Sequence, residues 1–375
     1  MTLYLDYSAS TPVNEEVLKY MVDIYTNYYG NAGSRTHAFG QRANEIVQKS
    51  RSTIASILNV EKSEVYFTSG ATESNNLAIL GLARWGEKNN RKHIISSAIE
   101  HKAVLEPLEY LKNNGFSVDL VGVDSFGRIK VDDVLSLLRQ DTLLVSIMHA
   151  NNETGIIQPV DEIGAALIDT DTYFHIDAAQ TYGKLVGEIK SLEYDFLSIS
   201  GHKMFAPQGI GALIVRSRNY KKPPVLPITF GGGQENGLRP GTLPVALIAG
   251  LGKATEFAAA YRMEWHKNNI AIKEAIIEQL SGLDYSINGE QAFCLPHVLN
   301  ISFHGVDSEA LMLALRESYA ISNGSACTSQ NYQASYVLKA MGLPDENISN
   351  AVRISWGKAE QLNLSIFINK ILTLS

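Results

Sequence analysis

The chain has 375 residues, of which 45% are hydrophobic and 19% charged, so it is long enough for one large domain and a smaller one with an ample core. Its formal net charge of −7 argues against broad nonspecific binding to nucleic acids, and no apolar run reaches membrane-spanning length. The only cysteines are Cys294 and Cys327, too few for a disulfide framework or a structural zinc site. Without an export signal, they predict a protein of the reducing cytoplasm.

The N-terminal part predicts a strand, a helix, a loop and a second helix. Residues 3–8 have the pattern of a short strand that leads into a turn. Thr11 and Pro12 predict the start of a helix, because a capping hydroxyl followed by a proline favours one. After a loop of small residues, a long amphipathic helix is expected. Its apolar face is formed by Ala43, Ile46, Val47, Ile54, Ile57 and Leu58.

Strands and helices then alternate along the chain. The predicted strands are 65–67, 93–96, 117–121, 142–147, 172–176 and 195–199, and the predicted helices between them lie near 71–82, 104–113, 131–139 and 160–169. This order predicts an α/β fold with right-handed crossovers and a largely parallel sheet covered by helices on both faces. No G-x-G-x-x-G motif follows the first strand, so a dinucleotide-binding fold has little support.

The last third of the chain indicates a second, smaller α/β domain. A helix from about residue 245 to 265 is expected to lead out of the large domain. Strands near 300–303 and 352–355 follow it. We expect the N-terminal strand to join this smaller domain.

Polar residues gather where the predicted strands end. In a parallel sheet, ligands bind at the carboxyl ends of the strands, and Thr72, His101, Asn152, Asp177 and Lys203 all follow strands. The turn 68–76 opens a helix, and the free N–H groups of such a helix start form a ready anion site. An ordinary capped helix start has the same pattern, so this motif alone is only moderately specific.

Two stretches point to a particular cofactor. The run 195–199 alternates apolar and small polar residues, as in a half-buried strand, and delivers Lys203 beside a hydroxyl and an imidazole that can hold a phosphate. A Schiff-base lysine needs such a site to lower its pKa. Asp177, at the end of an apolar strand, needs a cationic partner, which the ring nitrogen of pyridoxal phosphate offers. Alone, Lys203 could be a solvated lysine and Asp177 a helix cap. Together, in this order, they predict a pyridoxal phosphate site.

The motifs resemble, almost from end to end, those of the NifS/IscS-type (group I) cysteine desulfurases within the class V aminotransferases. The matching blocks are LDYSASTP, TSGATESNNLAI, EHKAV, MHANNETGIIQP, HIDAAQTYGKL, SGHKMFAPQGIGAL, GGGQENGLRPGT, NGSACTS and VRISWG. The resemblance implies a fold-type I homodimer that uses pyridoxal phosphate to convert L-cysteine to L-alanine, with the sulfur left as a persulfide on an enzyme cysteine. It also implies a large domain of residues 14–258 with a mostly parallel seven-stranded sheet, and a small domain of residues 1–13 and 259–375.

The resemblance also implies a role for each matching residue. Lys203 would be the Schiff-base lysine, Asp177 the partner of the pyridine nitrogen, and His101 the residue that stacks on the ring and carries a proton. Gln180 and Asn152 would bond the ring hydroxyl. The phosphate is expected among Ala71, Thr72, Ser200 and His202, with Thr242 from the other subunit, and the substrate carboxylate between Asn31 and Arg353.

The two cysteines are predicted to differ in role. Cys327 lies in the motif GSACTS, among small and polar residues that suit an accessible thiol, and it matches the persulfide cysteine of the family. Cys294 lies between Phe293 and Leu295, an apolar setting typical of a structural cysteine.

The chain departs from the family at several positions. Ala32 stands where a proline is common, Asn323 where a serine is common, and Asn236 where a basic or bulky residue is usual. The sequence ends at Ser375, whereas housekeeping members carry a longer tail that helps dock an iron–sulfur scaffold. We therefore expect a dedicated acceptor protein, in DNA phosphorothioation or tRNA thiolation, rather than the general iron–sulfur scaffold. We expect no direct contact with nucleic acid or membrane.

Two other functions are compatible with the same fold. An aminotransferase or lyase of this class that acts on another amino acid would not need the cysteine motif. A non-catalytic scaffold would not need Lys203, Asp177, His101 and Cys327 together. The sequence therefore favours the cysteine desulfurase, with no metal site.

Overall fold

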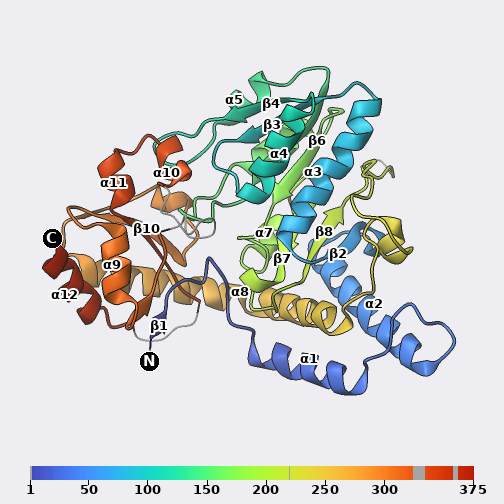
Figure 1. The fold of residues 1–375 in the computed structure, drawn as a ribbon, viewed down its shortest axis with the longest axis horizontal. Coiled ribbons are helices and arrows are strands. Elements are labelled where there is room, and N and C mark those ends of the chain that lie inside the picture. Colours follow the sequence, from blue (N-terminus) through green and yellow to red (C-terminus); the bar gives the residue numbers. More distant parts are fainter. Residues whose placement is uncertain (1, 219, 324–333, 358–361) are drawn as a thin grey trace.

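A computed structural model describes residues 2–218, 220–323, 334–357 and 362–375. Figure 1 shows two parts, a large one built on a seven-stranded sheet and a smaller one that holds the C-terminus. A single long helix, α8 (Val245–Leu280), runs beneath both parts.

The large sheet has the strand order β2-β8-β7-β6-β5-β3-β4. Its strands are β2 (Val65–Thr68), β3 (His93–Ser97), β4 (Ser117–Val121), β5 (Thr142–Met148), β6 (Tyr173–Asp177), β7 (Phe196–Ser200) and β8 (Gly211–Val215). Only β8 runs antiparallel to its neighbours, β2 and β7, and the other pairs are parallel. The predicted α/β fold with a mostly parallel seven-stranded sheet is confirmed.

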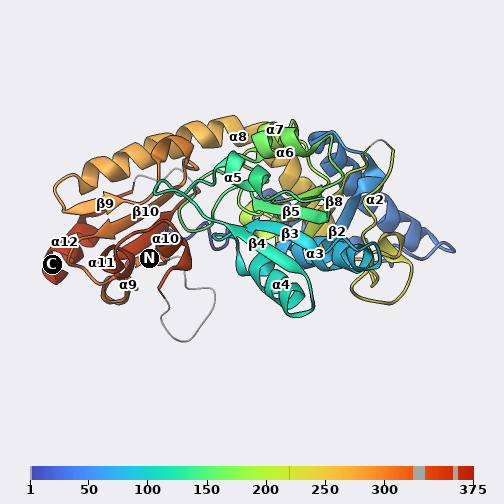
Figure 2. The ribbon, with the colours of Figure 1, turned by 90° about the horizontal axis from the view of Figure 1, so that it is seen from above.

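Helices cover both faces of this sheet, as Figure 2 shows. One face packs against α3 (Ala71–Lys88) and α4 (Lys102–Asn113). The other face packs against α2 (Ala38–Leu58), α5 (Val131–Ser136), α6 (Val160–Leu167), α7 (Val186–Ile189) and the first half of α8. Four short 3-10 turns, η1 (Lys62–Glu64), η2 (Gly201–Lys203), η3 (Gln234–Gly237) and η4 (Gln291–Phe293), lie in the connections.

The expectation that 195–199 is only half-buried is wrong. Every residue of β7 is buried, because the strand lies inside a sheet that is covered on both faces. Its small polar residues face buried partners instead of solvent. Ser198 Oγ, for example, lies 3.0 Å from His175 Nε2 on the neighbouring strand β6. Alternation of apolar and small polar residues therefore does not distinguish a half-buried strand from one that is buried on both faces.

The first helix begins later than the sequence predicts. Helix α1 (Glu15–Asn27) is capped by Asn14, whose side-chain oxygen accepts from the backbone N–H of Glu16. Thr11 is therefore not the cap. Its hydroxyl donates to the carbonyl of His202 (3.0 Å) and accepts from the N–H of Phe205 (2.7 Å), which ties the N-terminal segment to the turn that carries Lys203.

The small part has its own core. Strand β1 (Leu3–Tyr4) pairs in parallel with β11 (Tyr319–Ala320), so the N-terminal strand joins this part as predicted. A three-stranded antiparallel sheet has the order β12-β10-β9. The remaining elements are β9 (Tyr285–Ile287), β10 (Val298–Phe303), β12 (Ala351–Ser355), α9 (Ser308–Leu315), α10 (Tyr336–Ala340), α11 (Asp345–Ser349) and α12 (Ser365–Leu374).

Helix α8 is longer than the predicted helix that ends near 265. Its first half packs into the core of the large part, whereas Ile272, Ile276 and Leu280 pack into the core of the small part. Two separate cores therefore stabilise one continuous helix. The expected domain boundary at residue 258 falls inside this helix and stays a prediction.

No described helix has both the length and the apolar character needed to cross a bilayer. Within the same residues, no group of three histidine, cysteine or acidic side chains is arranged to hold a metal ion.

The glycine-rich loop around 231–241 is held by a buried ion pair. The carboxylate of Glu235 accepts from both terminal nitrogens of Arg51 (2.5 and 2.9 Å) and from the N–H of Phe67 (2.8 Å). Glu235 and Asn236 have left-handed φ angles of 49° and 53°. Asparagine enters this region more readily than most residues, which gives a physical reason for its presence at 236.

Replacing Glu235 by alanine is expected to lower the free energy of unfolding by roughly 3 kcal/mol, because Arg51 would be left with an almost buried, uncompensated charge. Urea unfolding followed by circular dichroism measures this loss. The matched control is Glu16→Ala, which removes the partner of Lys19 in an exposed pair and should cause no measurable change. Equal effects of the two substitutions would contradict the structural role of the buried pair.

Candidate active site

A cavity of about 460 Å³ opens at the carboxyl ends of the central strands. Its walls come from three sources: the strand ends of the large part, the N-terminal segment at Ser8, Ala9 and Ser10, and Arg353 on β12 of the small part. The structure therefore brings together most of the residues that the sequence predicts for one site. These are Ala71, Thr72, His101, Asn152, Asp177, Gln180, Ser200, His202, Lys203 and Arg353.

Lys203 lies in η2, directly after β7. Its Nζ atom donates to two backbone carbonyls of the N-terminal segment, that of Ser8 at 2.5 Å and that of Ala9 at 2.8 Å. The strand end thus presents the amine to the cavity, and a segment that begins in the small part holds it there.

Asp177 ends β6 and is held by two donors. Its Oδ2 atom accepts from Asn75 Nδ2 at 2.7 Å, and its Oδ1 atom accepts from the N–H of Ala179 at 2.9 Å. Asn75 is a site residue that the sequence analysis missed. One signal was present: Asn75 follows Ala71 by four positions on α3, so both residues lie on the same helix face.

His101 caps α4, with its Nδ1 atom accepting from the N–H of Ala103 at 3.0 Å. Burial lowers the pKa of His101, and the charge of Asp177 opposes this shift while that of Lys203 adds to it. The imidazole is therefore neutral near pH 7. Because Nδ1 accepts from the backbone, the proton of the neutral ring lies on Nε2.

Glu100 lies beside His101 and is fully buried. Its Oε1 atom accepts from Ser97 Oγ (2.6 Å) and from the N–H of Met148 (3.0 Å), and Oε2 has no hydrogen-bond partner in the described part of the chain. The pKa of Glu100 is raised to about 8, mainly by burial and with a smaller contribution from the charge of Asp177, against the hydrogen bonds from Ser97 and Met148. The carboxyl group is therefore mostly protonated at neutral pH.

One end of the cavity is suited to an anion. Helix α3 begins there after Gly70, whose φ of 149° requires glycine. The first N–H groups of this helix lie on the same wall as Ser200 and His202. Burial lowers the pKa of His202 to about 4, and the neighbouring cations Lys203 and Lys184 contribute, so its imidazole is neutral.

Several buried polar atoms around this cavity lack a hydrogen-bond partner in the described part of the chain. They are Ser8 Oγ, Asn75 Oδ1, Asn152 Oδ1, Gln180 Oε1 and Arg353 Nε. Buried polar groups in folded proteins are almost always paired, so five such atoms around one cavity indicate a polar ligand. A lysine amine, a strand-end carboxylate and an anion-binding helix start complete a set that fits pyridoxal phosphate.

Arg353 connects the cavity to the chain that leads into residues 324–333, which contain Cys327 and are called the cysteine segment. Its guanidinium donates to Asp6 Oδ1 (2.6 Å) and to the carbonyl of Asn152 (2.8 Å), while its backbone pairs with that of Ser322. On the other side of the segment, Ser335 Oγ donates to Glu153 Oε2 at 2.5 Å. One described flank is therefore anchored to the cavity-lining Arg353, and the other to Glu153, the residue that follows the cavity-lining Asn152.

Three predicted residues are not placed in the cavity. Asn31 lies in an exposed loop, where its side-chain oxygen accepts from the N–H of Gly33. Thr242 is exposed after the glycine-rich loop. Cys327 lies outside the described residues. Their roles stay predictions.

The sequence of this chain is similar to those of known proteins along most of its length. The family model described as "Aminotransferase class-V" matches residues 3–362. Cysteine desulfurase IscS of Anaeromyxobacter sp. (strain Fw109-5) is 42% identical to this chain, and the alignment covers 95% of this chain and 88% of that protein. A mitochondrial cysteine desulfurase of Arthroderma benhamiae is also 42% identical, with 95% and 71% covered.

Solved structures agree with the sequence relatives. A NifS-like protein superposes with a TM-score of 0.90 at 36% identity, and covers 100% of this chain and 98% of its own. DndA from Streptomyces lividans superposes with a TM-score of 0.83 at 46% identity, with 94% and 99% covered. On this evidence the chain belongs to the class V aminotransferase family and, within it, to the cysteine desulfurases.

Proposed function

We propose that this cysteine desulfurase holds pyridoxal phosphate on Lys203 and Asp177 and passes the sulfur of L-cysteine to Cys327. Membership of the class V family implies dependence on pyridoxal phosphate. The observation that carries the residue assignments is the cavity, in which Lys203, Asp177 and Arg353 converge with five unpartnered buried polar atoms.

The orphaned atoms are matched to the groups of the cofactor and the substrate. Asp177, oriented by Asn75, would hold the pyridine nitrogen, and Gln180 and Asn152 would bond the ring hydroxyl. The start of α3 with Ser200 and His202 would hold the phosphate. Arg353 would bind the carboxylate of L-cysteine, because a guanidinium offers two parallel donors to a carboxylate.

The chain's own groups account for the movement of protons and sulfur. The bound cofactor supplies an electron sink for bond cleavage at the α carbon of the substrate. The amine of Lys203 would take the α proton, and neutral His101 would carry a proton near the reacting atoms. The thiolate of Cys327 would attack the sulfur of L-cysteine. The carbon–sulfur bond would then break and leave its electron pair on the β carbon, which would take the proton carried by His101. Lys203 would return the α proton, L-alanine would leave, and Cys327 would keep the sulfur as a persulfide.

Cys294 is a poor candidate for this role. Its Sγ atom lies 3.3 Å from the carbonyls of both Thr154 and Leu295. Burial raises the pKa of its thiol, so the reactive thiolate is disfavoured. This environment supports the structural interpretation.

A homodimer is the proposed assembly. Apolar side chains of α1, of the loop that follows it and of the start of α2 are exposed in the single chain. They are Leu18, Val22, Tyr25, Tyr29 and Phe39, with exposures of 50% to 70%. A patch of this kind on a soluble enzyme is typical of a protein interface. In a dimer formed through this surface, the exposed Thr242 would contribute to the active-site cavity of the other subunit.

Lys203→Ala is expected to abolish covalent attachment of the cofactor, because the variant lacks the amine in the cavity that would form the Schiff base. The test is borohydride reduction followed by peptide mass spectrometry, which should place the pyridoxyl group on Lys203 in the wild type. Lys190→Ala, at an exposed lysine, should leave the labelling unchanged. Pyridoxyl mass on any other lysine would refute the assignment.

Cys327→Ser is expected to bind the cofactor and L-cysteine but to accumulate no protein persulfide, because sulfur abstraction needs a thiolate. The matched control is Cys294→Ser, which should keep the persulfide and most of the release of alanine and sulfide. Intact mass and alanine analysis measure both. The reverse pattern in the two variants would exchange their roles. Production of other amino acid products without sulfide would favour the alternative, an aminotransferase or lyase.

The acceptor is proposed to be a dedicated thiolation protein in DNA phosphorothioation or tRNA thiolation. The surface around the cysteine segment would select this partner, and Asn236 and Asn323 differ from the residues usual in the family. Persulfide-loaded enzyme is expected to transfer sulfur faster to such a protein than to the iron–sulfur scaffold of the same genome. Intact mass follows the transfer. Faster delivery to the scaffold would contradict this part of the proposal.

A further inference from the structure

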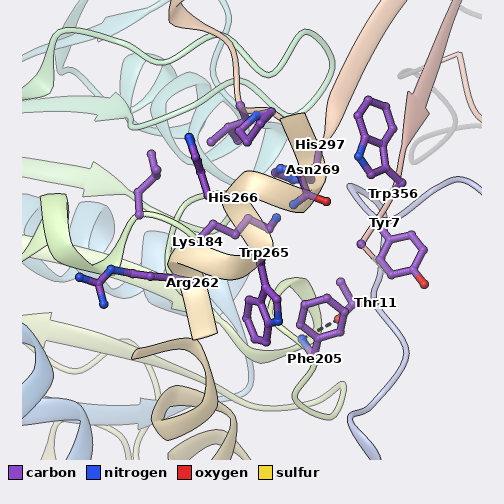
Figure 3. A pocket seen from close by; sticks show the side chains of 14 residues that line it. Tyr7, Thr11, Lys184, Phe205, Arg262, Trp265, His266, Asn269, His297 and Trp356 are labelled. Atoms are coloured by element: carbon purple, nitrogen blue, oxygen red, sulfur yellow. Dashed lines mark hydrogen bonds between the residues drawn. The ribbon is translucent and has the colours of Figure 1, made fainter. Parts of the chain in front are cut away.

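A second cavity lies between the large and small parts, and none of its lining residues belongs to the active-site cavity. Figure 3 shows its walls: Lys184 from the large part, Trp265, His266 and Asn269 from the middle of α8, and His297 and Trp356 from the small part. Its volume is about 30 Å³. About 10–15 Å³ on this measure admits one water molecule, so there is room for one or two particles of that size.

The lining of this interdomain cavity is one-sided in charge. It contains four side chains that can carry a positive charge, namely Lys184, Arg262, His266 and His297. No aspartate or glutamate is among the described residues that line it. A buried cationic group normally has a carboxylate partner, and none of the described residues supplies one to this space.

Three buried nitrogen atoms from this lining have no hydrogen-bond partner in the described ranges. They are Lys184 Nζ, His297 Nε2 and the indole Nε1 of Trp356. His297 and Trp356 are only 2% and 1% exposed. An ammonium group and an indole N–H can only donate, and neither is bonded to an acceptor in the described part of the chain. In Figure 3 the indole nitrogen of Trp356 lies on the side that faces Asn269.

Without such an acceptor, the local charges work against the ammonium form of Lys184. Its pKa is lowered to about 7, first by burial and then by the charge of Lys203. His297 has a pKa well below its ordinary value, first through burial and then through the cations Lys184, Lys273 and His266. A negative charge in the cavity would favour the protonated forms of both Lys184 and His297.

We propose that the interdomain cavity binds a small monovalent inorganic anion of halide size, held by the Lys184 ammonium and the Trp356 indole N–H. The cavity volume selects a halide over a larger anion such as phosphate. A water molecule could occupy the same space, but it would leave the charge of Lys184 uncompensated. Because its ligands come from both parts, a bound anion would connect the two parts beside α8.

The direct test is a crystal of the holoenzyme soaked in sodium bromide, with anomalous diffraction as the readout. We expect the anomalous density to show one ordered bromide in contact with Lys184 Nζ and Trp356 Nε1. In solution, bromide at about ten times its dissociation constant should raise Tm by roughly 1–3 °C relative to sodium gluconate at equal ionic strength, since gluconate is too large to enter.

Variants separate this site from general salt effects. Lys184→Met should remove both the bromide peak and the bromide-specific rise in Tm, and the control Lys190→Met, at an exposed lysine nearby, should keep both. If Lys184→Met does not fold, Trp356→Phe keeps the ring and removes only the N–H donor, and it should weaken bromide binding about 5- to 10-fold, the loss of one hydrogen bond. Water-level density, a peak that persists in Lys184→Met, or bromide seen only at crystal concentration with no shift in Tm would each overturn the proposal.

Discussion

The segment between β1 and α1 fixes the active site, because it is bonded to both parts of the molecule. The carbonyl of Ser8 accepts from Lys203 and from Gln180, and the N–H of Ser8 donates to Ser355 Oγ at the end of β12. Asp6 accepts from Arg353. The lysine of the large part and the arginine of the small part are thus held by neighbouring residues of one chain segment. Their separation depends on this segment.

Burial then decides which groups at the site carry charge. The pKa of His175, behind Asp177, is lowered to about 4 by burial, and the pKa values of His101 and His202 are lowered for the same reason. Glu100 is mostly protonated, because burial raises its pKa to about 8. Asp177 remains as the acidic side chain with two donors at the cavity wall. In the proposed complex, a protonated ring nitrogen would therefore meet one acidic acceptor instead of several competing charges.

The sequence predicted the features that depend on local pattern. The alternation of strands and helices indicated the sheet, and the strand ends located Lys203 and Asp177. Features that depend on distant contacts were not predictable. Asn75 contacts Asp177 across 102 positions, and the burial of β7 depends on helices far along the chain. The length of α8 depends on a second core, and Thr11 bonds His202 instead of capping α1.

The two cavities share backbone walls, which links the catalytic chemistry to the interdomain space. Along the N-terminal segment, Ser8 lines the active-site cavity and its neighbour Tyr7 lines the interdomain cavity. At the end of β12, Arg353 lines the active-site cavity and Trp356 lines the interdomain cavity. After β7, Lys203 lines the active-site cavity and Phe205 lines the interdomain cavity. Three short stretches of backbone separate the two spaces. Because packed protein interiors transmit small displacements, a shift of any of these stretches changes both walls. If the interdomain cavity is filled as proposed, its occupant would act on the same stretch of backbone that carries Lys203.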